Sequence, residues 1–572
     1  MKRARFGGLR APAVLTVVIV SSVLSANGLF AQTRLVAKAR PGENDKPAAS
    51  LKTNPGERPF TTGSTDPFLP VIDAAIRQGW AENEVTPSAP ADDYEWFRRV
   101  HLDIVGHIPR GEEVEPFVVD KDDRKRAKLV DKLLDDPAYA AHWMTVWTNL
   151  CIGRRTPERV NRDAMQKFFR ESFTTNRPWN EIVVALLVAE GRFDEVGAVN
   201  YLLAQMTMND EGVQATAKTS QLFMGMQLQC TQCHDHPFVN DWKQKQFWEI
   251  NSFFRQARRI NHRKLDPDTG RMVDDYSELV NEEFNGPVFY ERRNGEMQVA
   301  YPTFFNERIE IKDATNRRAE LARLITQGEP PLLARAMVNR MWSRFFGYGF
   351  TNPVDDMGPH RSPSHPELLD DMAREFARQG YDVRKLIRWI ANSEAYNLTS
   401  RFGKKNSSDD PEGGQMPLFS RVYLKSMEAE QLYDSLLIAT EADKAGKGEQ
   451  ADAGRQRDEW LRQFIITFGT DDNGEATTFN GTIPQALMMM NGPMIETAIS
   501  AEQGSYLHRV ISTDEPDVKK LQRLYLAALG RRATPRELNV ANKIVQATGD
   551  RFAAFQDVFW AVLNSNEFVI NH

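Results

Sequence analysis

Apolar residues recur three and four positions apart along most of this chain, which is the spacing of an amphipathic helix. Such stripes occupy residues 71–76, 96–104, 127–134, 165–173, 182–187, 213–226 and 242–254. Helical spacing returns near residue 317 and continues almost to the C-terminus. A hydroxyl residue followed three positions later by glutamate, as at 364–367 and 534–537, predicts a capping box at a helix start. The pattern therefore predicts a mainly α fold.

The pattern changes between residues 258 and 314. Short apolar segments at 287–290 and 297–301 flank the turn-prone residues 293–295, a combination that is typical of a β-hairpin. We expect a small β-rich insert here, between a helical domain over residues 70–257 and a second helical domain over residues 315–572. Two helical domains also suit a chain of 572 residues, which is too long for one compact core.

The first 31 residues have the layout of a secretory signal peptide. Four basic residues precede an apolar run over 13–24, and Ala26 and Ala31 are both suitable last residues before cleavage. An uncleaved segment that acts as an N-terminal anchor is the alternative. Residues 32–69 are rich in proline, glycine and charged residues, which predicts a disordered tether. We therefore expect an exported protein, periplasmic or extracellular, with no membrane span after the signal segment.

The composition narrows the classes of function. The formal net charge is -6 and no tract rich in Lys and Arg is present, so no nucleic-acid partner is expected. The chain has only three cysteines, Cys151, Cys230 and Cys233, which are too few for a disulfide scaffold. Cys151 is expected to be a buried, small apolar residue, and its pairing with another cysteine is the less favoured alternative.

The strongest chemical signal is the sequence Cys230-Thr231-Gln232-Cys233-His234, at the end of a helix predicted over about 212–229. Two cysteines three apart, with a histidine after the second, are the attachment pattern of c-type haem. Two thiols on one turn can each add to a vinyl group of the porphyrin, and the next side chain then lies under the iron. Cys230 and Cys233 are therefore expected to form thioethers, and His234 to be the proximal iron ligand. The alternative without haem is a thiol pair, reduced or bridged, at a helix end.

Longer motifs show a family resemblance. The segments 98–109 (RRVHLDIVGHIP) and 228–238 (LQCTQCHDHPF) make residues 70–256 resemble the planctomycete-type cytochrome-like domain, a domain of unknown function. From about residue 315 onward the chain resembles the usual C-terminal companion of that domain, also of unknown function. The motifs there are 336–342 (AMVNRMW), 345–350 (FFGYGF), 353–357 (PVDDM), 363–369 (PSHPELL) and 485–487 (QAL). The resemblance implies a secreted, cytochrome-like protein and assigns no reaction.

Residues around the motif are candidates for supporting roles. Asp235 and His236 follow it directly, and we expect them to orient His234 or to bind a haem propionate. The sixth iron ligand is open among His107, His142, His360 and the methionines. A second histidine or a methionine there would favour electron transfer, whereas an open position would favour ligand binding or peroxide chemistry.

A second polar cluster is predicted from residues 339–365. Its members are Asn339, Arg340, Asp355, Asp356, His360 and His365. Paired carboxylates beside histidines could bind a metal or act as acid and base. We favour a structural role, in which Arg340 pairs with one aspartate at a domain joint. If the two domains converge, this cluster could also form a non-haem metal site together with Asp235 and His236.

Three classes of function follow. The leading hypothesis is an exported c-type haem redox protein, either an electron carrier or the redox subunit of an enzyme, which acts with a periplasmic redox partner. The second is a haem-free, metal-dependent periplasmic enzyme that acts on complex polysaccharide. The third is a non-catalytic binding or assembly protein, in which the motif cysteines would matter only for stability.

Overall fold

A computed structural model describes residues 63–206, 211–310, 315–445, 459–467, 485, 488–490, 492–500 and 502–572. The predicted signal peptide, the predicted tether up to residue 62 and two residues of the 485–487 motif lie outside this part. All described residues belong to one compact unit, Pro59–His572. No helix in the described ranges is long and apolar enough to cross a membrane.

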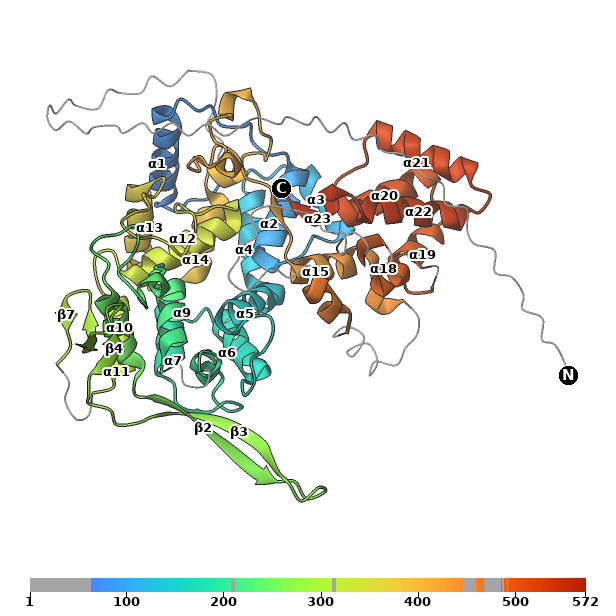
Figure 1. Ribbon diagram of the computed structural model, residues 1–572. Coiled ribbons are helices and arrows are strands. Elements are labelled where there is room, and N and C mark those ends of the chain that lie inside the picture. The colour runs from blue at the N-terminus through green and yellow to red at the C-terminus, as the bar shows by residue number, and fades with distance from the viewer. Residues whose placement is uncertain are drawn as a thin grey trace. The chain divides into compact units, whose positions relative to one another are not determined.

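The prediction of a mainly α fold is confirmed (Figure 1). The helices of the first part are α1 (Leu69–Glu82), α2 (Asp93–Val105), α3 (Gly111–Val119), α4 (Lys125–Asp135), α5 (Pro137–Ile152), α6 (Arg162–Thr174), α7 (Trp179–Val188), α8 (Asn200–Ala204), α9 (Val213–Met224) and α10 (Gln244–Asn251). The later helices are α11 (Arg317–Ile325), α12 (Leu332–Phe346), α13 (Pro366–Arg378), α14 (Val383–Asn392), α15 (Ala429–Thr440), α18 (Pro493–Ala498), α19 (Tyr506–Ile511), α20 (Asp517–Leu529), α21 (Pro535–Ala547), α22 (Arg551–Leu563) and α23 (Asn566–Val569).

One of the two predicted capping boxes is confirmed. At the start of α21, the side chain of Thr534 accepts from the N–H of Glu537, and the Glu537 carboxylate accepts from the N–H of Thr534. The box predicted at 364–367 is wrong. His365, rather than Ser364, precedes α13, and it makes no side-chain cap. Pro366 at the first helical position supplies the preset backbone there instead.

The strands are short and antiparallel, and most of them lie within residues 257–308. Strands β2 (Ala257–Leu265) and β3 (Met272–Asn281) form a hairpin with an irregularity after His262, and β1 (Gly191–Arg192) pairs with the base of β3. Strand β4 (Val288–Glu291) pairs with β5 (Met297–Ala300), and β6 (Thr303–Phe304) pairs with β7 (Glu307–Arg308). Far along the chain, β8 (Lys425–Ser426) pairs with β9 (Ile570–Asn571).

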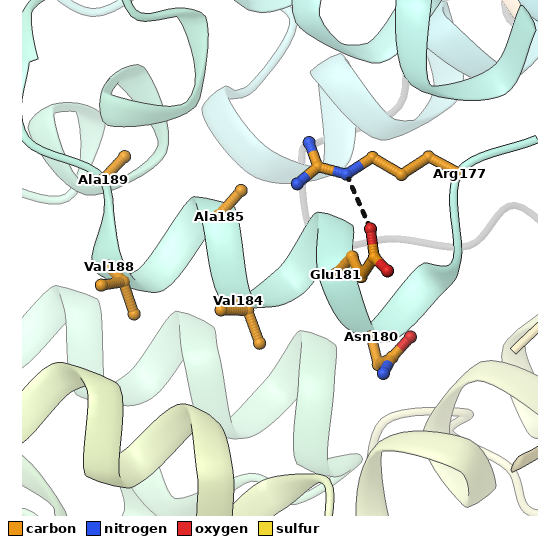
Figure 2. Close-up of a pocket in the computed structure, with 7 residues that line it drawn as sticks. All are labelled: Arg177, Asn180, Glu181, Val184, Ala185, Val188 and Ala189. Carbon is orange, nitrogen blue, oxygen red and sulfur yellow. Dashed lines mark ion pairs between the residues drawn. The ribbon is translucent and has the colours of Figure 1, made fainter. Parts of the chain in front are cut away.

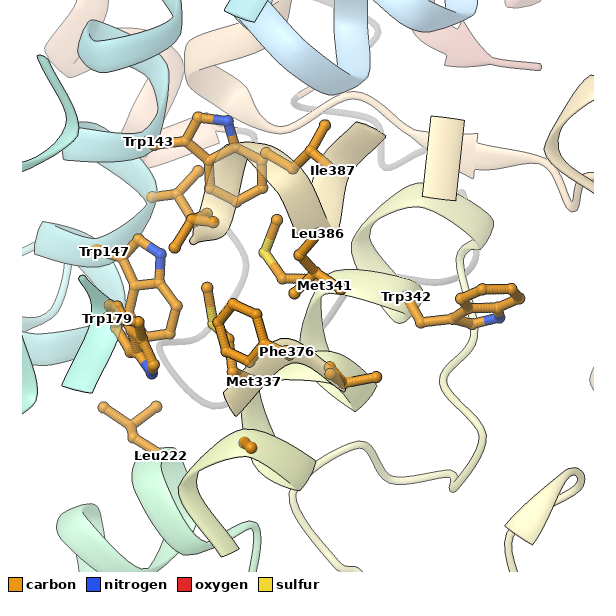
Figure 3. Packing of buried hydrophobic residues seen from close by; sticks show 14 of the residues in the cluster. Trp143, Trp147, Trp179, Leu222, Met337, Met341, Trp342, Phe376, Leu386 and Ile387 are labelled. Atoms are coloured by element: carbon orange, nitrogen blue, oxygen red, sulfur yellow. The ribbon is translucent and has the colours of Figure 1, made fainter. Parts of the chain in front are cut away.

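Buried apolar side chains form two clusters. The first extends from Ile72 to Tyr423 and is rich in tryptophan (Figure 3). In it the rings of Trp147 from α5 and Trp179 from α7 lie 4.2 Å apart. The second cluster joins residues 427–569 to the end of α2 and the residues after it. The first cluster thus includes residues from both sides of the domain boundary predicted at 314, and that boundary stays a prediction.

Two buried arginines of α2 connect segments that are distant in sequence. Arg98 donates to the carbonyl oxygens of Ala528 (2.9 Å) and Phe568 (2.8 Å). Arg99 donates to those of Tyr396 (2.8 Å) and Leu398 (2.9 Å). Because a buried guanidinium must satisfy several donors, Arg98 fixes the backbone near residues 528 and 568, and Arg99 fixes that of residues 396–398. The motif at 98–109 therefore organises the fold.

Candidate functional site

The Cys230–His234 motif lies on a turn that follows α9. The predicted helix over 212–229 is shorter than expected, because α9 ends at Met224 and Gly225 takes a left-handed conformation with φ +66°. The left-handed conformation favours glycine at position 225, and a Cβ there would also displace the Cε methyl of Met357. A 3-10 turn, Leu228–Thr231, then presents Cys230.

Both motif thiols are free and exposed, whereas Cys151 is buried in α5. Burial raises the pKa of the Cys151 thiol to about 12, which makes it unreactive at neutral pH. Cys230 and Cys233 are thus the thiols that an external reactant can reach. The prediction that Cys151 is buried is confirmed.

The turn between the two cysteines is held by side chains of α10. The carbonyl oxygen of Gln232 accepts from Nε2 of Gln244 (3.2 Å) and from the indole N–H of Trp248 (3.1 Å). Gln244 also donates to the carbonyl of Glu291 in β4 (2.9 Å), and Trp248 stacks on Tyr290 at a ring separation of 5.8 Å. The hairpin β4–β5 therefore supports the helix that positions the motif.

His234 is oriented by a backbone contact. Its Nδ1 lies 2.6 Å from the carbonyl oxygen of Asp235, so Nδ1 carries the proton and donates it, which leaves Nε2 as the lone-pair nitrogen. This is the arrangement that metal-bound histidines commonly show. The Asp235 carboxylate has a different role, since it accepts from the N–H of Gln244 (3.0 Å) and pairs with Lys243 (3.2 Å). The hydrogen bond from the Gln244 N–H lowers the pKa of Asp235.

His236 is buried and fixes the segment after the motif. Its Nδ1 accepts from the N–H groups of Phe238 (3.2 Å) and Val239 (3.1 Å), which places the ring proton on Nε2. The ring lies 5.2 Å from that of Trp242 and 5.1 Å from that of His360. Burial lowers the pKa of His236, the nearby His360 lowers it further, and Asp356 opposes both effects.

Asp355 from the second polar cluster contacts the residues that lead into the motif. Its carboxylate accepts from the side-chain amides of Gln221 on α9 and of Gln227, the latter at 2.8 Å. The N–H of Met357 also donates to the carbonyl of Gly225 (2.8 Å). The structure thus brings the two predicted groups of site residues together. Neither glutamine carries a chemical signal that would have marked it in the sequence.

The neighbouring Asp356 holds His360. The Oδ2 atom of Asp356 lies 3.0 Å from Nε2 of His360 and 3.2 Å from Nε of Arg361. Asp356 is buried, and within the described part of the chain its Oδ1 atom and Nδ1 of His360 have no hydrogen-bond partner. The ring contact between His360 and His236 joins this pair to the motif segment.

The remaining predicted residues lie apart from these contacts. Asn339 on α12 donates to the hydroxyl of Thr351 (2.8 Å) and to the carbonyl of Val354 (2.9 Å), so it shapes the loop that carries Asp355. Arg340 is buried on the same helix. His365 packs against Gly79 of α1, and burial lowers its pKa to about 4.

Two pockets lie elsewhere on the molecule. One, of about 520 Å³, is lined mainly by α7 residues, with Val184 and Val188 near an ion pair between Arg177 and Glu181 at 3.5 Å (Figure 2). The other, of about 420 Å³, lies at the β2–β3 hairpin. Neither pocket contains a predicted site residue. Among the described residues, no group of three or more His, Cys, Asp or Glu side chains is placed to hold a metal ion.

Two family models match the sequence. Residues 71–259 match PSCyt2, a protein of unknown function (DUF1549), and residues 317–478 match PSD1, a protein of unknown function (DUF1553). The chain therefore carries the predicted pair of domains of unknown function, in the predicted order. The comparisons with curated proteins and with solved structures gave no match. The Cys230–His234 motif therefore lies in the region that matches the first family, and Asp355 lies in the region that matches the second.

Proposed function

We propose that this chain is an exported c-type haem redox protein. The observation that carries the proposal is the combination of two free, exposed thiols with a histidine whose Nδ1 is occupied by a carbonyl oxygen. The thiols suit addition to two porphyrin vinyl groups, and Nε2 of His234 suits iron ligation. The donor set therefore fits haem c.

Each residue of the turn has a distinct part in this proposal. Cys230 and Cys233 would hold the porphyrin through thioethers, and His234 would be the proximal ligand. Gln244 and Trp248 hold the carbonyl between the two cysteines, which keeps the thiols on one turn. Bound haem supplies one-electron chemistry, and its potential depends on the second axial ligand and on the surrounding charges.

The contacts narrow the candidates for that second ligand. His360 is in ring contact with His236, two positions after His234. His142, by contrast, lies on α5 against Gly106, and desolvation lowers its pKa to about 3. We therefore favour His360 over His142. The proposal has three further parts. They are an export signal over 1–31, two helical domains joined by the β-containing insert, and a periplasmic redox partner.

The test is a pyridine haemochrome spectrum and a haem-stained denaturing gel, on protein made in a host that matures c-type cytochromes. We expect covalent haem in the wild type and none in a Cys230→Ala, Cys233→Ala variant. His234→Ala should keep the thioethers available and change the absorption of the iron. Folded, well-matured wild-type protein without covalent haem would refute the proposal.

One observation favours the metal site that the second class of function, a haem-free metal-dependent enzyme, requires. The buried Oδ1 of Asp356 and Nδ1 of His360, which have no hydrogen-bond partner in the described residues, are acceptors suited to a cation. Metal analysis of the purified haem-free protein tests this alternative. Stoichiometric metal that is lost in Asp356→Asn would support it, and its absence would leave the pair with a structural role.

A further inference from the structure

We propose that Asp355 is a positioning residue for the Cys230–His234 turn, so that the second matched region sets the geometry of a site whose thiols belong to the first. This inference deepens the proposed haem function and rests on it for its chemical consequence. Its structural part concerns the turn itself and can be tested without haem.

Three contacts link the loop at 353–361 to the approach of the turn. Asp355 accepts from Gln221 and from Gln227, which lie on either side of the helix end at Gly225. Met357 covers Gly225, with its N–H bonded to the Gly225 carbonyl at 2.8 Å. After α9 ends at Met224, one backbone bond, from the N–H of Met226 to the carbonyl of Ser220 (2.9 Å), still ties the following residues to the helix, and the chain then turns away.

Asp355 adds side-chain contacts on both sides of this turn. It is buried and 7% exposed, so the hydrogen bonds that its carboxylate accepts are little weakened by solvent. Gln227 directly precedes the 3-10 turn that presents Cys230. An acceptor that holds Gln221 and Gln227 at once therefore fixes the direction in which the turn leaves α9, while Gln244 and Trp248 hold the turn itself.

A charge swap tests this directly. Gln227→Glu places a second carboxylate against Asp355, and the repulsion should release the turn. Adding Asp355→Asn to that variant restores the pairing, because the amide introduced at position 355 can accept from Gln221 and donate to the carboxylate introduced at position 227. Asp355→Ala removes both acceptors without adding a charge and should act like Gln227→Glu. The matched control is Asn176→Asp. The side chain of Asn176 donates to Asp382 (3.0 Å), so this contact also joins the two matched regions, but it lies away from the motif.

The first readout is amide hydrogen exchange of residues 226–235 in the full-length, haem-free protein. Loss of a hydrogen bond to a charged group predicts exchange faster by roughly tenfold to a hundredfold in Gln227→Glu and Asp355→Ala. The double variant should return to the wild-type rate, and Asn176→Asp should leave this segment unchanged. The second readout is the yield of covalent haem after maturation, which should fall in the same two variants and recover in the swap.

The outcomes separate the inference from the proposed function. Exchange that follows the predicted order in a protein that never takes up haem would support the role of Asp355 and refute the haem proposal. Normal haem attachment, with exchange in 226–235 unaffected by Gln227→Glu and Asp355→Ala, would refute the inference and keep the haem proposal. Failure of the swap to restore both readouts would also overturn the role assigned to Asp355.

Discussion

Replacement of Asp103 by asparagine should destabilise the folded chain by about 3 kcal/mol, the lower end of the cost of breaking a buried ion pair. Asp103 lies on α2, and its side chain is only 3% exposed. It accepts from the hydroxyl of Tyr396 (2.6 Å), from Nζ of Lys425 (2.6 Å) and from Nδ2 of Asn571 (2.7 Å). Asparagine has nearly the same shape but no charge, and it can accept at only one of its two terminal atoms.

The cost arises mainly at Lys425. Its ammonium group is buried, and apart from Asp103 it donates to backbone carbonyls such as that of Phe345 (2.9 Å). Burial lowers the pKa of Lys425, and Asp103 counteracts that effect. Without the carboxylate, the lysine is a desolvated cation held by neutral acceptors. Since Lys425 and Asn571 lie on the paired strands β8 and β9, the change should loosen both.

Urea unfolding followed by tryptophan fluorescence measures the effect. Lys425→Met should also be costly, because it leaves Asp103 without its cation. The double variant should cost at least about 1 kcal/mol less than the sum of the single variants, since each removes the same interaction. A loss below about 1 kcal/mol for Asp103→Asn, or strictly additive costs, would refute the reasoning.

Three further variants test other parts of the structure. Burial raises the pKa of Asp73 to about 6, so the folded state favours the protonated acid and loses stability as the pH rises from about 4 to 6. Asp73→Asn should therefore match the wild type near pH 4 and exceed it by about 2 kcal/mol at about pH 7 in urea titrations, and a constant difference would contradict this. Thr534→Ala should cost about 1 kcal/mol through loss of the α21 cap, and thermal unfolding checks this against the exposed Thr174→Ala. Gly225→Ala should cost about 1–2 kcal/mol and displace Met357, and a stability equal to the wild type would show that the left-handed turn is not required.

Local signals account for the parts of the fold that the sequence predicted. The apolar stripe at 165–173 corresponds to α6, whose residues Met165, Phe169 and Phe173 are buried, and the signal at 534–537 marks the start of α21. These features depend on residues within one or two turns of each other. The CxxCH motif was equally visible, because its chemistry resides in adjacent side chains.

Predictions were less accurate wherever a distant residue decides the conformation. The helix predicted to 229 ends at Met224, where Met357 packs on a left-handed glycine. The capping box predicted at 364–367 is absent, because His365 takes the position before Pro366 and packs against α1. In both cases the local pattern is compatible with two structures, and a tertiary contact selects one.

The sequence by itself determined a mainly α chain, the pair of domains of unknown function and the presence of a CxxCH motif. Only the tertiary structure decided which polar residues belong with that motif. Asp355, Asp356 and His360 join it, whereas Asn339 shapes their loop and His365 lies against α1. The physical reason is that helical periodicity and motif spacing are short-range properties. Which carboxylate meets which amide across more than a hundred residues depends on how the helices pack.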